Sequence, residues 1–294
     1  MINRFILAGI SMLALPSLAK AECAAAIQSI GAVPVVQYEP FSNQAATATL
    51  TVDLLLAEDA TDCSLGLAVF GLEIGAGRTA KLNGAELIYR LFNDGKELSN
   101  DSSSPVSFMT KGGDRVRVSL RIEVPAGQLA LAGTYVDPIS VRLVDTGAGN
   151  APLGADVSAV ITVAMNSRAQ INLAGGSVSP AGFGFARLDF GTLKQNQFRT
   201  AQLQLRSTAP VTLTIASENG SKLQRLGGKE MLAYDLLLGG TRLMISGGPA
   251  TLVRDASPSR MGANYSLEVS ISGNPELLPA GEYRDLLTIN VDPN

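Results

Sequence analysis

Two cysteines, Cys23 and Cys63, are the residues of this 294-residue chain whose type and spacing indicate a definite reaction. An exported pair most simply forms a disulfide, and closing a loop of about 40 residues stabilises a fold by roughly 3 to 4 kcal/mol. A metal or redox pair is the weaker alternative, because no third or fourth ligand lies nearby in the sequence. We therefore predict a disulfide, with no metal and no cofactor.

The chain contains no histidine and no tryptophan. The absence of histidine removes the commonest general base and metal ligand, and it excludes Ser-His-Asp and Cys-His catalysis. An exported hydrolase with Ser-Lys or Asp/Glu chemistry stays open as an alternative, although no motif for it is recognisable. Asp137 and Asp285 occupy matching positions in separate halves of the chain, so we interpret them as turn or strand-entry residues that bind backbone. We predict no enzymatic activity.

Charge does not identify a partner. The formal net charge is −3, and acidic and basic residues are interspersed along the chain. A nucleic-acid-binding surface or a polybasic membrane patch would concentrate Lys and Arg. We expect no nucleic acid among the partners.

The N-terminus has the features of a secretory signal. Residues 1–21 combine a basic Arg4, an apolar stretch and a small-x-small cleavage site, so that the mature chain would start at Glu22. No later run approaches the roughly 18 apolar residues of a membrane-spanning helix. We expect an exported, soluble product with about two domains of ordinary size.

A long motif occurs twice. Its copies, residues 129–137 and 277–285, share the pattern Leu-x-x-Ala-Gly-x-Tyr-x-Asp, and each runs into a strand with apolar residues at alternate positions. Further upstream, a Tyr-x-Leu-x-x-x-Gly pattern that begins at Tyr89 recurs from Tyr234. Matches in the same order indicate two copies of one domain, joined near Asn166, with a period too long for a solenoid repeat.

Short alternating runs of Val, Ile, Thr and Leu between 30 glycines and 14 prolines predict an all-β chain. Six or seven strands per copy fit two tandem immunoglobulin-like β-sandwich domains, residues 22–165 and 166–294. The predicted strands are 48–56, 65–74, 86–92, 115–124, 135–144 and 157–164 in the first domain, and 187–190, 201–206, 211–216, 232–238, 265–271 and 283–291 in the second.

The two copies differ beyond the repeated motif. The first domain has a further apolar strand at 157–163, whereas the second copy reaches Asn294 soon after its strand at 287–291. We expect the C-terminal domain to lack its final strand, and therefore to need one from another molecule. In the ordinary alternative, residues 287–291 pair with a strand that the domain already contains.

From about residue 169 onward, the sequence resembles the spore coat protein U domain, the pilin fold of archaic chaperone-usher pili. Leu188-Asp-Phe-Gly191 is similar to the LDFG signature of that family, and the likeness continues through residues 207–215, the Tyr234 motif and residues 279–285. The C-terminal domain departs from the family in having no cysteine, so the intradomain bridge common there is missing. The first domain is more divergent and lacks LDFG, but its 132–137 block still looks related.

This resemblance implies a role in a pilus. Single-domain members carry an N-terminal donor strand that completes the next subunit, whereas Cys23 here ties down the mature N-terminus immediately. A subunit that receives a strand and gives none belongs at the end of a fibre, and two-domain members resemble tip adhesins. The alternative in the same family is a structural shaft, adaptor or coat subunit.

The resemblance also implies partners and a location. The partners are a periplasmic chaperone, an outer-membrane usher, the donor strand of an adjacent pilin subunit and an abiotic or host surface. The location is the cell surface of a Gram-negative bacterium, reached through the periplasm. In this interpretation the C-terminal domain exposes an acceptor groove, with Leu287, Ile289 and Val291 on one wall and Ile171 and Leu173 on the other.

The adhesive end of the first domain should lie away from the joint. The loop at 145–156 precedes the last strand, and loops near 57–63 and 100–114 should share its end of the sandwich. Exposed apolar clusters in such loops can adhere to apolar surfaces without a defined pocket. The candidate adhesive residues are Pro105, Val106, Phe108, Met109, Pro152 and Leu153. In the alternative interpretation, Val106, Phe108 and Met109 form a short buried strand.

Overall fold

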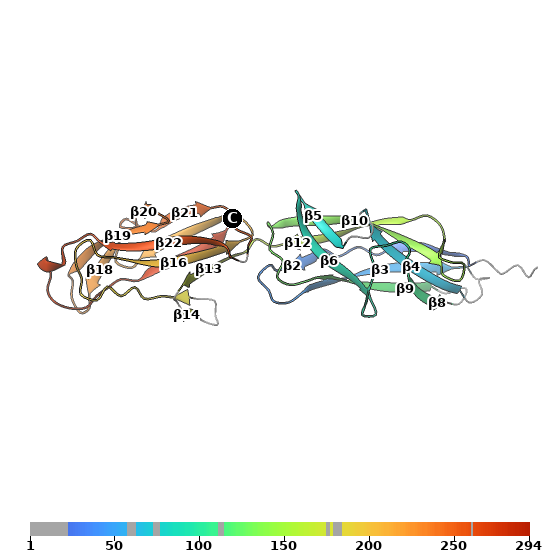
Figure 1. The fold of residues 1–294 in the computed structure, drawn as a ribbon, viewed down its shortest axis with the longest axis horizontal. Helices are drawn as coiled ribbons and strands as arrows, with labels where there is room; N and C mark the ends of the chain where they lie inside the picture. Colours follow the sequence, from blue (N-terminus) through green and yellow to red (C-terminus); the bar gives the residue numbers. More distant parts are fainter. Residues whose placement is uncertain are drawn as a thin grey trace, which may run out of the picture.

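The computed structural model describes residues 23–57, 63–72, 77–110, 115–174, 177–178, 184–259 and 261–294. The predicted signal peptide and much of the 57–63 loop lie outside these residues. The described chain consists of strands and turns, with one short 3-10 helix, Pro275–Leu277, and forms two domains that lie end to end (Figure 1). Within these ranges no helix has the length and hydropathy needed to span a bilayer.

Domain 1 is a two-layer sandwich. One layer has the order β1-β3-β9-β6, and hydrogen bonding continues through β5 to β10, β12 and β2, while β4 and β8 extend the second layer. The strands are β1 (Ala25–Ile30), β2 (Val36–Tyr38), β3 (Ala46–Leu56), β4 (Cys63–Gly71), β5 (Arg78–Leu82), β6 (Ala85–Asn93), β7 (Lys96–Glu97), β8 (Val106–Thr110), β9 (Arg115–Val124), β10 (Gly133–Asp145), β11 (Ala151–Pro152) and β12 (Val157–Met165).

Domain 2 repeats this arrangement with two separate main sheets. Its larger sheet has the order β13-β16-β22-β19-β18-β23, and its smaller sheet has the order β21-β17-β24. The strands are β13 (Ala169–Ala174), β14 (Ser177–Val178), β15 (Gly184–Phe185), β16 (Phe198–Ser207), β17 (Val211–Ser217), β18 (Lys222–Arg225), β19 (Met231–Leu238), β20 (Thr241–Leu243), β21 (Ala250–Arg254), β22 (Ala263–Ile271), β23 (Tyr283–Arg284) and β24 (Leu287–Pro293).

Alternation of apolar and polar residues explains why these segments are strands. In β9 the polar positions face solvent while Val118, Leu120 and Ile122 are at most 7% exposed. Successive side chains of a strand point to opposite faces, so one face enters the core and the other meets water. Each domain has its own buried apolar cluster, formed by side chains from both of its layers. The predicted all-β, two-sandwich architecture is confirmed.

The repeated glycines mark tight turns at matching places. Gly95 lies between β6 and β7 with φ +81°, and Gly240 lies between β19 and β20 with φ +79°. L-residues with a side chain rarely adopt this left-handed conformation, whereas glycine adopts it without steric cost. The two hairpins are therefore the structural counterpart of the repeated Tyr-x-Leu-x-x-x-Gly pattern.

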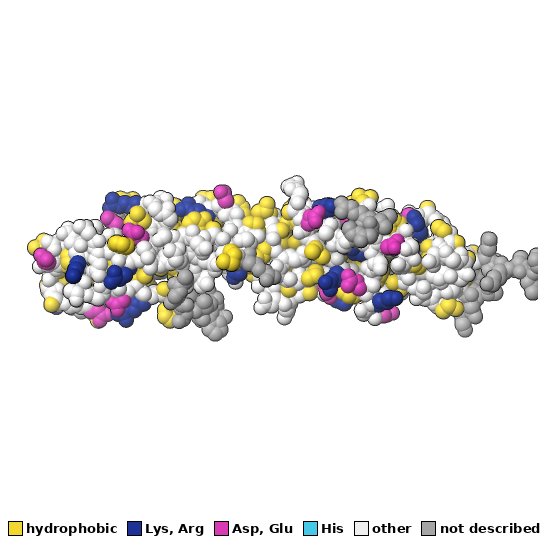
Figure 2. Space-filling view, in the orientation of Figure 1, with side chains coloured by type: hydrophobic (Ala, Val, Ile, Leu, Met, Phe, Trp, Pro, Cys, Tyr) yellow, Lys and Arg dark blue, Asp and Glu magenta, His cyan; other side chains and the backbone are white. Residues whose placement is uncertain are grey.

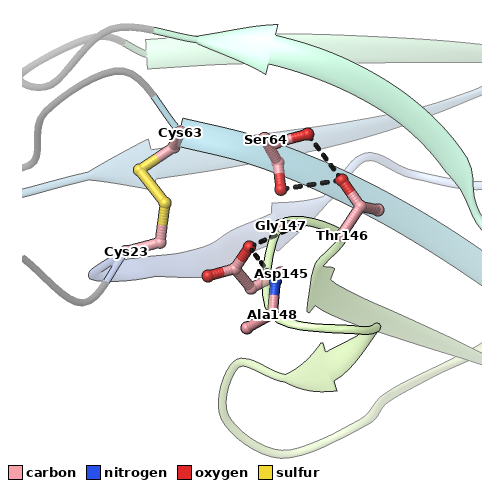
Figure 3. The surroundings of a disulfide bond; sticks show 7 residues. All are labelled: Cys23, Cys63, Ser64, Asp145, Thr146, Gly147 and Ala148. Atoms are coloured by element: carbon pink, nitrogen blue, oxygen red, sulfur yellow. Dashed lines mark hydrogen bonds between the residues drawn. A yellow bond between two sulfur atoms is a disulfide. The ribbon is translucent and has the colours of Figure 1, made fainter. Parts of the chain in front are cut away.

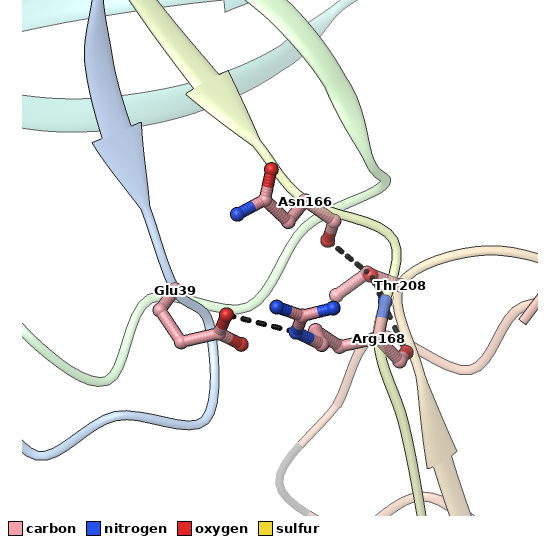
Figure 4. A network of polar contacts seen from close by, with 4 residues as sticks. All are labelled: Glu39, Asn166, Arg168 and Thr208. Atoms are coloured by element: carbon pink, nitrogen blue, oxygen red, sulfur yellow. Dashed lines mark hydrogen bonds and ion pairs between the residues drawn. The ribbon is translucent and has the colours of Figure 1, made fainter.

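The joint between the domains is short and hydrogen-bonded (Figure 4). Thr208, only 1% exposed, donates its hydroxyl to Asn166 O at 3.0 Å and accepts the Arg168 N–H at 3.0 Å. Its carbonyl accepts the Ala132 N–H across the joint at 2.7 Å. Arg168 also forms an ion pair with Glu39 of domain 1 at 2.8 Å. The joint therefore holds the two domains in line.

Two strand predictions need correction. Residues 187–190 are not a strand, because no described strand pairs with their backbone. The single strand predicted over 283–291 is divided into β23, which pairs with β18, and β24, which pairs with β17. Asp285 and Leu286 lie at the break. The division lets one polypeptide segment contribute an edge to each sheet of domain 2.

Candidate functional site

The predicted disulfide is present at the distal end of domain 1 (Figure 3). Cys23 and Cys63 are bonded with their Cα atoms 5.8 Å apart, which joins the segment before β1 to the first residue of β4. Next to it, the Thr146 N–H donates to Ser64 O at 2.9 Å. The loop between β10 and β12 therefore lies at the same end of the sandwich as the disulfide.

The candidate adhesive residues divide into two groups. Residues 106–110 form β8, which pairs with β4, so the alternative interpretation holds for Val106 and Phe108, which pack on the core. Pro105 and Leu153 are half-buried. Met109, 71% exposed, and Pro152, in β11, remain on the surface. Within the loop predicted near 100–114, residues 106–110 are thus a strand, and its side chains Val106 and Phe108 are turned inward.

A tyrosine-aspartate hydrogen bond recurs in both domains and connects the two repeated motifs. Tyr89 donates its hydroxyl to Asp137 Oδ2 at 2.6 Å, and Tyr234 donates to Asp285 Oδ2 at 2.5 Å. Burial, together with the neighbouring carboxylate, raises the pKa of both phenols above their ordinary value, so both stay neutral. The aspartates were predicted to bind backbone; Asp285 does accept the Asn219 N–H at 3.0 Å, but tyrosine is the partner that the domains share.

The second tyrosine of each motif has a structural role. Tyr135 donates its hydroxyl to Leu131 O at 2.6 Å, and Tyr283 donates to Pro279 O at 2.7 Å, four residues back in both cases. These bonds fix the turn that leads into β10 and into β23.

The carboxylates do not gather into a reactive cluster in the described part of the chain. No group of three or more His, Cys, Asp or Glu residues there could hold a metal ion. A hollow of about 260 Å³ on domain 1 is lined by Asp137 together with Thr79, Lys81 and Asn100. Figure 2 shows side chains of both charge signs interspersed on the face drawn.

The distinguishing feature is an incomplete repeat. By position in the sheets and by pairing, β13, β16, β22 and β19 correspond to β1, β3, β9 and β6 of domain 1. In the same way, the counterpart of β5 is β18, that of β7 is β20, that of β8 is β21 and that of β4 is β17. The counterpart of β10 is β23 together with β24. In domain 1 the other edge of β10 is paired with β12 from Gly133 to Val141. Among the described residues of domain 2, no strand pairs with the corresponding edge of β24.

Burial shows the same difference. Ile139, Val141 and Leu143 of β10 are at most 2% exposed, whereas the matching Leu287, Ile289 and Val291 of β24 are only half-buried. Ile171 and Leu173 of β13, at the edge of the facing sheet, are half-buried as well. All five pack against the core of domain 2. The structure thus brings the five predicted groove residues to two neighbouring sheet edges, where their burial is incomplete.

No family model matches the sequence, and no curated protein matches it. One similar solved structure is the CsuC-CsuE chaperone-tip adhesion subunit pre-assembly complex from archaic chaperone-usher Csu pili of Acinetobacter baumannii, with 14% identity, a TM-score of 0.49, and coverage of 92% of this chain and 100% of that chain.

Two further similar structures are adhesins. The CupB6 tip adhesin from Pseudomonas aeruginosa has 13% identity and a TM-score of 0.37, covering 91% of this chain and 94% of that chain. CfaE, the adhesive subunit of CFA/I fimbria of enterotoxigenic Escherichia coli, has 14% identity and a TM-score of 0.39, covering 78% of this chain and 81% of that chain.

Proposed function

We propose that this protein is the tip adhesin of an archaic chaperone-usher pilus, exported through the periplasm to the surface of a Gram-negative cell. Domain 2 joins the fibre by accepting a donor strand from an adjacent pilin subunit, and domain 1 contacts an abiotic or host surface. The observation that carries the proposal is that the long strands of the domain 1 sheets recur in domain 2, with no described counterpart of β12. The LDFG-containing pattern in domain 2 supports the same family of assemblies.

The energetics favour a strand from outside. Fully burying a large aliphatic side chain stabilises a fold by roughly 1.5 to 3 kcal/mol. Five half-buried side chains line the groove, so completing their burial is worth roughly 4 to 8 kcal/mol before the cost of ordering the strand. That is comparable with the whole net stability of a domain, about 5 to 15 kcal/mol. Domain 2 therefore needs a periplasmic chaperone before assembly at the outer-membrane usher, and a neighbouring pilin afterwards.

The direction of the missing strand supports a terminal position. In domain 1, β12 runs antiparallel to β10. The C-terminal end of β24 lies beside the joint (Figure 1), so a strand antiparallel to β24 runs from the joint toward the far pole of domain 2. A partner whose folded body comes after its donor strand would then extend the rod at that pole. Domain 1 would remain at the free end, where Met109 and Pro152 are exposed apolar candidates for contact.

The first described strand of this chain is already used within domain 1. The chain enters β1 two residues after Cys23, and β1 pairs with β3 along its length. The described N-terminal segment is therefore part of the sheet of domain 1. A shaft or adaptor subunit would need a free strand to donate.

A chain that supplies its own missing strand tests the proposal. A second copy of residues 157–165 is joined to Asn294 through a flexible Gly-Ser linker, and the full chain is expressed in the periplasm without a chaperone. We expect the folded protein to accumulate and the thermal transition of domain 2 to rise. The matched control carries Ile161→Ser and Val163→Ser in the appended copy only, because both side chains are fully buried in β12. Equal yields and equal transitions for the two chains would refute the acceptor role.

A further inference from the structure

The segment Leu188–Phe190, in the LDFG-like motif, stands in domain 2 where β2 stands in domain 1. Both segments lie between the first two long strands of their domain. Tyr38 and Phe190 each precede the next of these strands by the same interval, since β3 begins at Ala46 and β16 begins at Phe198. The Leu188-Asp-Phe190 sequence thus matches the Val-Gln-Tyr sequence of β2.

The burial pattern is the same in both segments. In β2, Val36 and Tyr38 are at most 1% exposed, while the residue between them faces solvent. Leu188 and Phe190 also pack against the core of their domain, with an exposed Asp189 between them, but they are only half-buried. This is the same reduction in burial that separates β24 from β10.

The difference lies in the backbone partner. β2 pairs in parallel with the end of β12, Val36 with Val163 and Tyr38 with Met165, and Tyr38 O accepts the N–H of Asn166. No described strand pairs with Leu188–Phe190. Instead, Phe190 O accepts the side-chain amide of Gln197 at 2.7 Å. A side chain therefore holds the carbonyl whose counterpart in domain 1 binds the main chain just after β12.

Other contacts hold the segment in place. The Arg199 guanidinium donates to Asp189 O at 3.0 Å and lies 5.7 Å from the centroid of the Phe190 ring. Gly191, with φ +61°, ends the segment and donates its N–H to the Asp189 carboxylate at 2.8 Å. A pre-positioned extended segment whose backbone pairs with no described strand can accept one at a lower ordering cost.

We propose that Leu188–Phe190 is the second edge of the acceptor slot, an inference that rests on the proposed function. The incoming segment of a partner protein lies between two backbones, antiparallel to β24 and parallel to Leu188–Phe190. It takes the place of β12, with apolar side chains at every second position directed into the core. Its last apolar residue, in the place of Met165, lies beside Phe190 at the far pole.

The register is fixed by the twin domain. Ser140 of β10 is opposite Ser158 of β12, which places the counterpart of Ser158 opposite Thr288. Gln37 of β2 is opposite Ala164, which places the counterpart of Ala164 opposite Asp189. Thr288 and Asp189 are both exposed, so cysteines there should not disturb the core.

Two disulfide cross-links in the chain with the appended β12 copy test the two edges separately. The first pairs Thr288→Cys with Ser158→Cys in the copy, and reports the strand beside β24. The second pairs Asp189→Cys with Ala164→Cys in the copy, and reports the parallel edge. A mismatched chain with Asp189→Cys and Ser158→Cys in the copy is the control. Cross-links are located by peptide mass mapping, which also identifies the native Cys23–Cys63 bond.

We expect both matched pairs to link and the mismatched pair to stay reduced. Linking at Thr288 without linking at Asp189 would overturn the second edge and leave the acceptor role standing. Failure of both matched pairs would overturn both proposals. The mismatched pair could also link with a yield similar to that of the matched Asp189 pair. The strand would then slide in the slot, and the stated register and the inference would both be overturned.

Discussion

The strand that completes domain 1 offers a sharp test of how the twin domains differ. Ile161 in β12 is fully buried, whereas Val160, its neighbour on the same strand, is 47% exposed and faces solvent. Replacing a buried Ile by Ala costs about 2 to 5 kcal/mol, because transfer energy is lost and a cavity is left. A substitution at an exposed position usually changes stability by less than about 0.5 kcal/mol. Ile161→Ala should therefore remove a large part of the net stability of domain 1, which is about 5 to 15 kcal/mol.

Calorimetry on the full chain measures the effect. For a domain of this size, about 1 kcal/mol lowers the melting temperature by roughly 3 to 5 °C, so Ile161→Ala should lower the transition of domain 1 by roughly 6 to 25 °C. Val160→Ala is the matched control and should leave it nearly unchanged. The transition of domain 2 should not move in either variant. Similar shifts for Ile161→Ala and Val160→Ala would show that β12 is not an integral strand, and the comparison with domain 2 would then lose its basis.

Three further predictions concern single contacts. Replacing Cys23 and Cys63 together by Ser should lower the free energy of unfolding of domain 1 by roughly 3 to 4 kcal/mol. The measurement is the urea concentration at the unfolding midpoint, which should fall. A loss below about 1 kcal/mol would contradict the loop-closure argument. Burial and Asp137 raise the pKa of the Tyr89 phenol. The unfolded chain therefore releases this proton near pH 10, whereas the folded chain keeps it. The free energy of unfolding should then fall as the pH rises above about 10, by up to about 1.4 kcal/mol per pH unit. Tyr89→Phe should make that decline shallower in urea titrations between pH 9 and 11, and an unchanged slope would show that Tyr89 does not stay protonated. Thr208→Val leaves the Arg168 N–H without its acceptor at the joint. Exchange of that amide with solvent, measured by hydrogen-exchange mass spectrometry or NMR, should become at least several-fold faster. Equal exchange rates in the two proteins would mean that the Thr208 hydroxyl does not order the joint.

The repeated domain and most long strands could be predicted from the sequence, because alternation along a strand is a local signal. β9 matches its predicted range, and β3, β10 and β22 each extend it by a few residues. The short strand β2 could not be predicted. It is only three residues long, and its partner β12 lies far away in the sequence, so no local pattern marks it.

Long-range pairing also explains what was missed at the site. The repeats singled out Tyr89 and Asp137, but their hydrogen bond joins residues 48 positions apart, and sequence spacing alone does not indicate it. Leu188-Asp-Phe190 alternates like a strand, which predicts one there, yet alternation does not supply a partner for its backbone. The same reasoning, applied to Val106 and Phe108, favours a strand over an exposed loop, and there β4 does supply the partner.

The short joint has a mechanical consequence. β12 ends at Met165 and β13 begins at Ala169, so tension along the rod enters domain 1 along the axis of β12. The hydrogen bonds of β12 to β10 are perpendicular to the strands, so such a load shears them together rather than opening them one after another. A segment seated beside β24 would be loaded in the same geometry. Domain 1 and the completed domain 2 would then both resist a pull by shear between paired strands.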